Sequence, residues 1–134
     1  MRLDAKLAVL NAINELMHAG EIGRLGDFVA DGFVMHEDPG MPYGGTYLGP
    51  AGFVEMVGKV VATWRNLRTE TLAVLDEPGA SGVLMKMRLT GDAPGGGEPI
   101  VGYTSEFWRI EDGKLTEWRV WYYDTPTLSA RLAG

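Results

Sequence analysis

The feature that most constrains the fold is a change in the spacing of apolar residues near residue 67. Before it, apolar residues recur every three or four positions, as in helices; after it, they alternate with polar ones, as in half-buried strands. The intervening segments 76–79, 92–97 and 111–113 carry the Gly, Pro and Asp typical of hairpin turns. The pattern predicts an antiparallel sheet with strands at Leu67–Leu75, Val83–Thr90, Pro99–Ile110 and Lys114–Asp124.

The N-terminal half predicts helices around one short strand. A helix over Leu3–Met17 stops at Gly20, and a shorter one covers residues 22–29 before a turn at 30–32. A strand at Phe33–Asp38, a shaped loop at 39–49 and a helix from Pro50 to Trp64 follow, and the tail from Thr125 adds a helical turn. Helices segregated from a run of strands favour an α+β fold, with helices laid against one sheet face.

Alternation within one strand indicates which sheet face is dry. Val83, Met85, Met87 and Leu89 share one side of their strand, and the charged residues between them lie opposite. Methionine side chains adapt to irregular surfaces, so the two methionines make this face adaptable. The alternation therefore predicts one dry, adaptable sheet face, against which the helices can lie.

Composition narrows the function classes. The 134 residues suit one domain, expected to span 1–134. Acidic residues outnumber basic ones 18 to 12 without any basic cluster, so neither nucleic acid nor membrane is an expected partner. With no cysteine and two histidines, no disulfide, metal site or cofactor is expected. The apolar runs are short and an acid follows the N-terminus closely, which predicts a cytoplasmic protein without a signal peptide.

Three segments carry a resemblance to a known superfamily: ADGFVMHEDPG at 30–40, PYGGTYLG at 42–49 and EFWRIEDGKL at 106–115, with Tyr122-Tyr123-Asp124 closing the last strand. With them the chain resembles the nuclear-transport-factor-two-like superfamily, which includes steroid delta-isomerases, limonene epoxide hydrolases, scytalone dehydratases and SnoaL-like polyketide cyclases. The resemblance implies a cystatin-like cone, a half-barrel of curved antiparallel sheet with helices on its concave face, often as a homodimer. It implies a pocket for a small apolar molecule and does not select one reaction.

The functional residues of the steroid isomerases carry over only in part. Their general base maps onto Glu37, with Asp38 as a rival, and their protonated acid maps onto Glu106. Their two tyrosines map onto Ile13 and Val57, so a steroid isomerase of the known kind is disfavoured.

Other branches of the superfamily match less well. The Asp-Arg-Asp set of the epoxide hydrolases maps onto Glu106, Thr104 and Val120, so that mechanism is disfavoured too. The acid on the last strand of the SnoaL-like cyclases also falls near Val120, with Asp124 beyond it at the strand end.

Glu106 is the first candidate catalytic residue. Alternation groups it with Thr104, Trp108 and Ile110, and the resemblance implies that this group faces the pocket. A carboxyl group among apolar neighbours there would have a raised pKa and could transfer a proton near neutral pH. If the faces are reversed, Glu106 is instead solvated and pairs across strands with Arg119 or a lysine.

Glu37, His36 and Asp38 are the remaining candidate catalytic residues. Glu37 shares its face with Phe33 and Met35, which favours an inward position. A one-residue shift of register would make His36 and Asp38 the inward pair instead, and both alternatives remain open.

Aromatic and sulfur-containing side chains complete the predicted substrate-binding set. Either Tyr43 and Tyr47 act at the mouth of the pocket or they only anchor their loop. The other aromatic residues can equally be core, because the core wall of this fold is also its pocket wall. The predicted set is Trp108, Trp118, Tyr122, Met85, Met87, Tyr43, Tyr47 and Trp64.

The opposite face of the last strand predicts a homodimer. Arg119, Trp121 and Tyr123 form a strip there that is too aromatic for free solvent.

Two functions remain open. One is a cofactor-independent enzyme of cyclase or isomerase type, with Glu106 and Glu37 transferring protons on a small apolar cyclic or aromatic substrate. The other is a ligand-binding or accessory domain with the same pocket and no chemistry; the missing tyrosines favour it, whereas the two acids favour the enzyme.

Overall fold

A computed structural model describes residues 1–134. Its elements in chain order are α1 Leu3–Ala19, the 3₁₀ helix η1 Ile22–Asp27, β1 Val29–Glu37, β2 Gly45–Leu48, α2 Gly49–Thr63, β3 Arg65–Asp76, β4 Gly82–Asp92, β5 Ile100–Glu111, β6 Lys114–Tyr122 and α3 Thr125–Ala133.

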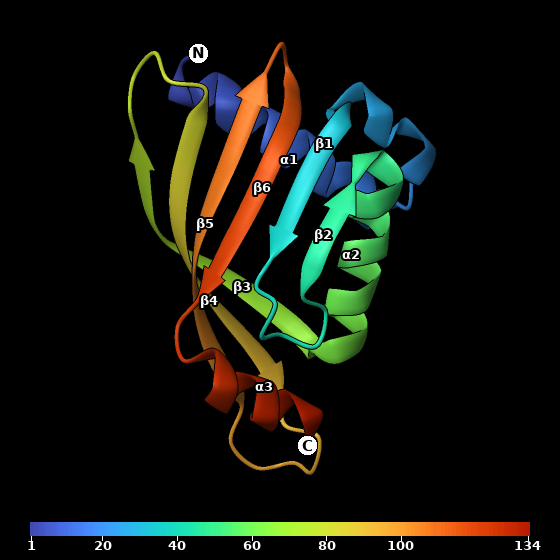
Figure 1. Cartoon of the computed structure of the whole chain (residues 1–134), viewed down its shortest axis with the longest axis vertical. Coiled ribbons are helices and arrows are strands. Elements are labelled where there is room, and N and C mark those ends of the chain that lie inside the picture. The colour runs from blue at the N-terminus through green and yellow to red at the C-terminus, as the bar shows by residue number, and fades with distance from the viewer.

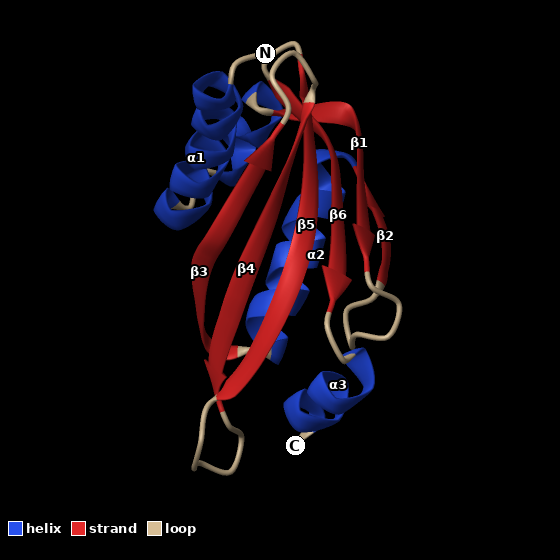
Figure 2. Cartoon of the chain, turned by 90° about the vertical axis from the view of Figure 1, so that its left-hand side faces the viewer, coloured by secondary structure: helices blue, strands red, loops and turns tan.

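The six strands form one sheet in the order β2-β1-β6-β5-β4-β3 (Figure 1). All neighbours are antiparallel except β1 and β6, which pair in parallel. The curved sheet carries α1 and α2 on one side, and α3 lies across the end where β6 finishes (Figure 2). This arrangement confirms the predicted α+β fold, an open cone of sheet with helices against its concave face.

The two long helices end and begin where the sequence indicates. After α1, Gly20 adopts a left-handed φ of 72°, and its N–H bonds the carbonyls of Leu16 and Met17. Before α2, Pro50 occupies the first helical turn, where its missing N–H costs nothing. The four strands predicted after residue 67 are all present, each within two residues of its predicted bounds.

The structure differs from prediction before residue 50. β1 begins at Val29 rather than Phe33, and the residues predicted as a turn form a bulge in it, because Val29 pairs with Leu115 while Val34 pairs with Glu117. The helix predicted over 22–29 is a 3₁₀ helix ending at Asp27. The predicted loop at 39–49 contains the edge strand β2. The tail forms α3, nine residues long.

Two apolar clusters fill the concave side. The larger lies under α1 and α2 and includes Ile13, Phe33 and Phe53. The smaller surrounds Trp64 and Leu128 and joins α3 to the lower sheet. Partly buried residues that pack against both clusters, Val60, Met87 and Tyr122, mark the boundary between them.

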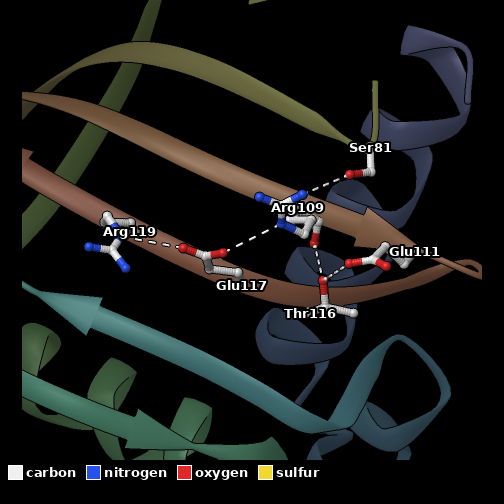
Figure 3. Close-up of polar contacts among 6 residues, drawn as sticks. All are labelled: Ser81, Arg109, Glu111, Thr116, Glu117 and Arg119. Carbon is white, nitrogen blue, oxygen red and sulfur yellow. Dashed lines mark hydrogen bonds and ion pairs between the residues drawn. The ribbon is translucent and has the colours of Figure 1, made fainter. Parts of the chain in front are cut away.

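The convex face carries a polar network on β5 and β6 (Figure 3). Glu117 lies between two arginines, 3.5 Å from Arg109 Nε and 3.3 Å from Arg119 Nε. Arg109 also donates to Ser81 Oγ at 3.1 Å. Beyond this network the same face exposes Tyr103, Trp121 and Tyr123. None of the helices has the length and apolar character needed to cross a membrane.

Candidate functional site

A cavity of about 280 Å³ lies between α2 and the concave sheet face. Its size is just below the usual range for ligand pockets, roughly 300–1,000 Å³. Most of its wall is apolar, and the polar residues that reach it include two carboxylic acids. The lining residues are Asn14, Glu37, Met56, Val57, Val60, Val61, Leu67, Thr69, Met87, Leu89, Glu106, Trp108, Trp118, Val120 and Tyr122.

Glu37 and Glu106 enter this cavity from two strands that flank β6. Glu106 on β5 pairs with Val120, and Glu37 lies one residue beyond the His36–Arg119 pair between β1 and β6. Both acids are therefore level with Val120, with backbones about 10 Å apart at the usual strand spacing. Each side chain is 5% exposed. The sheet thus brings together two acids that are far apart in sequence.

Glu106 has two hydrogen-bond donors. Thr104 Oγ1 donates to its Oε2 at 2.7 Å, and Trp118 Nε1 donates to its Oε1 at 3.1 Å. Burial raises the pKa of Glu106, and these two bonds oppose that rise because they favour the anion. Thr104 occupies the same strand face two residues earlier, so the alternation of β5 itself supplies one donor.

Glu37 has much weaker hydrogen bonding. Its Oε1 accepts one long hydrogen bond, from the backbone N–H of Asp38 at 3.4 Å. Burial, followed by repulsion from Glu106, raises the pKa of Glu37 to about 8. The Asp38 N–H and the Tyr122 hydroxyl oppose this rise.

The two acids are therefore chemically unequal. The two donors of Glu106 favour its anionic form, whereas Glu37, with one long hydrogen bond, keeps its proton up to about pH 8. An ionised and a protonated carboxyl in one apolar cavity can act as base and acid in the same turnover.

His36 and Asp38 do not form an inward pair. β1 keeps Phe33, Met35 and Glu37 buried, so His36 lies on the opposite, half-buried face. Asp38 follows the strand end and accepts hydrogen bonds from Gly40 N–H at 2.9 Å and Thr125 Oγ1 at 2.9 Å. The alternative register is thus not the one in the structure, and Asp38 joins the 38–44 loop to α3.

Four of the predicted substrate-binding residues line the cavity: Met87, Trp108, Trp118 and Tyr122. The two indoles stack face to face, with ring centroids 3.9 Å apart and ring planes inclined by 20°, so the aromatic wall that they give the cavity is a stacked pair. Trp108 Nε1 is buried without a hydrogen-bond partner. A planar apolar ligand would fit against such a wall.

The other four predicted substrate-binding residues lie outside the cavity wall. Met85 belongs to the larger core cluster, because α1 covers that end of β4. Trp64 is buried in the smaller cluster and does not line the cavity. Tyr43 and Tyr47 are buried as well, and Tyr47 Oη donates to the Tyr43 carbonyl at 2.7 Å, so their loop is anchored inward.

Sequence reasoning missed several residues of the cavity. Asn14 reaches it from α1 and Thr69 from β3, each beside apolar residues of its own element. The position of Asn14 within the apolar spacing of α1 was the one available signal. No group of three or more His, Cys, Asp or Glu residues is arranged to hold a metal ion.

A second, more open depression lies between α3 and the β4–β5 turn. It has a volume of about 690 Å³, and Arg131 is its one ionisable side chain. It contains no buried polar pair, so the smaller cavity is the candidate site.

A half-open cone of sheet enclosing an apolar cavity with inward acids defines a protein of the nuclear-transport-factor-two-like (NTF2-like) class. The sequence profile of the SnoaL-like domain matches residues 10–118. The chain therefore belongs to the SnoaL-like domain family. A search among curated protein sequences found no match.

Several solved structures share this fold. TerC, co-crystallised with polyporic acid, superposes with a TM-score of 0.78 at 17% identity, covering 97% of this chain and 99% of the other. An NTF2-like protein from Burkholderia thailandensis superposes with a TM-score of 0.75 at 19% identity, covering 100% of this chain and 99% of the other. For a putative polyketide cyclase from Xanthomonas campestris pv. campestris the TM-score is 0.67 at 16% identity, and the superposition covers 96% of this chain and 97% of the other. These identities establish a common fold and no common activity.

Proposed function

We propose that the protein is a cofactor-independent acid–base enzyme of the SnoaL-like cyclase or isomerase type. Its substrate is a small apolar ring compound bound in the cavity between α2 and the sheet. The observation that carries the proposal is the pair of buried acids with unequal hydrogen bonding, Glu37 and Glu106. One structural neighbour, described as a putative polyketide cyclase, agrees with this class.

The proposed reaction is an enolisation. The Glu106 carboxylate takes a proton from a carbon next to a substrate carbonyl, and the C–H electron pair moves to form a carbon–carbon double bond. The carbonyl oxygen receives the proton of Glu37. Glu106 is then protonated, Glu37 is ionised and the substrate is an enol. In the second step a carbon of the enol either takes the proton of Glu106 or attacks a second carbonyl, while the enol hydroxyl returns its proton to Glu37.

The test follows exchange of the C2 protons of 1-tetralone in D₂O by NMR. The native protein should accelerate exchange, and Glu106→Gln should slow it by roughly 10²–10⁴-fold, the usual contribution of a general base. Glutamine keeps the size, can accept from Trp118 and can donate to Thr104, so binding and folding should hold and stability should not fall. Glu98→Gln, on an exposed loop residue, is the matched control.

A ligand-binding module is the second candidate function. The two positions that match the isomerase tyrosines, Ile13 and Val57, are apolar, and Ile13 is buried in the core. Tight binding of 1-tetralone without faster exchange in the native protein would replace the enzyme proposal with this one.

A further inference from the structure

A chain of hydrogen bonds leads from the interior of the protein to the wall of the cavity. Trp64 Nε1 donates to Tyr43 Oη at 2.9 Å, and Tyr43 Oη lies 2.6 Å from Tyr122 Oη. Tyr43 and Trp64 are buried and outside the cavity, whereas Tyr122 lines it. Nothing in the proposed proton transfer between Glu37 and Glu106 uses these three residues.

The backbone fixes the first member of this chain. The Trp64 ring lies against two glycines, one on β4 and one on β5. A Cβ at Gly91 would approach Trp64 Cε3 to 2.8 Å, and one at Gly102 would approach Trp64 Cη2 to 3.3 Å. Larger residues at either position would displace the indole. The two strands therefore hold its N–H toward Tyr43.

The chain has only one direction that satisfies every buried hydroxyl. Burial raises the pKa of both Tyr43 and Tyr122, so each hydroxyl keeps its proton. An indole N–H only donates, so Trp64 cannot accept the Tyr43 proton. The one remaining acceptor near Tyr43 Oη is Tyr122 Oη. The reverse direction would leave the Tyr43 proton buried without an acceptor, which is costly.

We infer that Trp64 and Tyr43 are positioning residues that turn the Tyr122 hydroxyl proton into the cavity, where Tyr122 binds the carbonyl oxygen of a ring ketone. The inference rests on the proposed function and adds to it the group that recognises the carbonyl oxygen of the ring ketone. Tyr122 donates a hydrogen bond to the oxygen that Glu37 protonates, and Tyr43, which donates to Tyr122, makes it a stronger donor. In the free protein the same proton points toward Glu37.

The surroundings of Glu37 allow this proton direction to be measured. The groups that face Glu37 are Glu106 from β5, Asp38 at its own strand end, and the hydroxyls of Tyr122 and Tyr43. The side provided by α2 is apolar. The carboxyl signal of Glu37 can be followed by ¹³C NMR against pH and assigned by its loss in Glu37→Gln.

Two variants test which way the Tyr122 hydroxyl proton points. The sign of the change in the pKa of Glu37 depends on whether this proton points into the cavity or toward Tyr43. If Tyr122 donates into the cavity, Tyr122→Phe removes a donor to the anion and raises the pKa of Glu37, starting near 8, by about 1. Tyr43→Phe leaves the Tyr122 proton in place, so the pKa of Glu37 should not fall. Tyr103→Phe, on the exposed sheet face, should leave it unchanged.

The opposite results would overturn the inference. If Tyr122 donates to Tyr43 instead, Tyr122→Phe removes lone pairs that face Glu37, and the pKa of Glu37 falls or stays constant. Tyr43→Phe would then free the Tyr122 proton toward Glu37 and lower this pKa. Both signs are readable without any enzymatic activity.

A binding experiment tests the substrate class separately. Quenching of tryptophan fluorescence gives the affinities of 1-tetralone and of tetralin, which lacks the carbonyl. The ketone-to-hydrocarbon affinity ratio should fall about five- to tenfold in Tyr122→Phe, the loss of one hydrogen bond. An unchanged ratio overturns the role of Tyr122 in binding. If neither ring binds the native protein, the proposed function fails, and the NMR titration still decides the proton direction.

Discussion

Glu37 links the stability of the protein to pH. Its ordinary pKa of 4.5 rises to about 8 on folding, chiefly through burial. Between these values the folded chain holds a proton that the unfolded chain releases, so the free energy of unfolding decreases as pH rises. Below about pH 4.5 Glu37 is protonated in both the folded and the unfolded chain, so it does not make the free energy of unfolding depend on pH. Above about pH 8 the decrease in the free energy of unfolding is complete. Its size is on the order of 3–5 kcal/mol.

We expect Glu37→Gln to remove most of this loss, because glutamine cannot ionise. Thermal unfolding of the native protein and the variant between pH 5 and 9 measures the effect: the native melting temperature should fall across the range, and the variant should lose less. Glu98→Gln should follow the native curve. Parallel curves for Glu37→Gln and the native protein would contradict the assignment of the raised pKa to Glu37.

At the scale of elements, a buried ion pair attaches α1 to the β3–β4 turn. Lys6 is 0% exposed, and its Nζ lies 2.6 Å from Asp76 Oδ1 and 3.0 Å from the Gly82 carbonyl. Asp76 ends β3 and Gly82 begins β4, so one ammonium group joins a helix to both strands. This contact holds α1 over the end of the sheet where the larger cluster lies.

Removing the acid of this pair should be much more costly than removing an exposed one. Asp76→Asn leaves a buried ammonium without its counter-charge, which typically costs about 3–5 kcal/mol. Asp92→Asn breaks an exposed pair with Arg68 and should cost less than about 1 kcal/mol. Urea unfolding of both variants makes the comparison. Equal decreases in the free energy of unfolding would show that the buried Lys6–Asp76 pair stabilises the fold no more than the exposed pair does.

Helices and strands were predicted correctly where the apolar periodicity lies within one segment. They were missed where contacts between distant segments determine the structure. Alternation grouped Glu106 with Thr104 and Trp108, and Glu37 with Phe33 and Met35, because a strand presents every second residue to one side. Which face points inward followed from the family resemblance for Glu106, and the register of β1 stayed open until the structure placed Glu37 inward. The bulge after Val29 and the four-residue strand β2 were missed, since Gly and Asp there resemble an ordinary turn or loop.

The hydrogen-bonded chain from Trp64 to Tyr122 could not be predicted from sequence. Its members lie 21 and 79 positions apart, and no spacing rule relates residues at such separations. The sequence left open whether Tyr43 belongs to a lid or anchors its loop, and only the folded sheet places its hydroxyl beside Tyr122.

For the whole molecule, we propose that two copies associate through the convex sheet face. Trp121 is 49% exposed and Tyr123 is 77% exposed, and Tyr103 lies on the neighbouring strand. Such an aromatic patch beside the paired charges of Glu117, Arg109 and Arg119 suits an interface with an apolar centre and a polar rim. A stable dimer would bury about 1,200–2,000 Å².

Sedimentation should therefore give about twice the 14.6 kDa mass of the chain at micromolar concentration. Trp121→Glu should convert the protein to a monomer, because two buried carboxylates would face each other across the interface. Leu72→Glu, which places the same charge on an equally exposed residue of β3, should leave the dimer intact. A native protein that sediments as a monomer would remove this proposal.

The parallel pairing of β1 with β6 also affects how fast the protein folds. Met35 on β1 pairs with Trp118 on β6, so the sheet depends on a contact between segments that lie near opposite ends of the chain. Long-range strand pairing of this kind slows folding, because a large loop must close first. During synthesis, β3, β4 and β5 can pair as hairpins as soon as they emerge, while β1, paired with β2 on one edge, waits for β6 on the other. A chain that stops before β6 would expose two unpaired strand edges, where other chains could add.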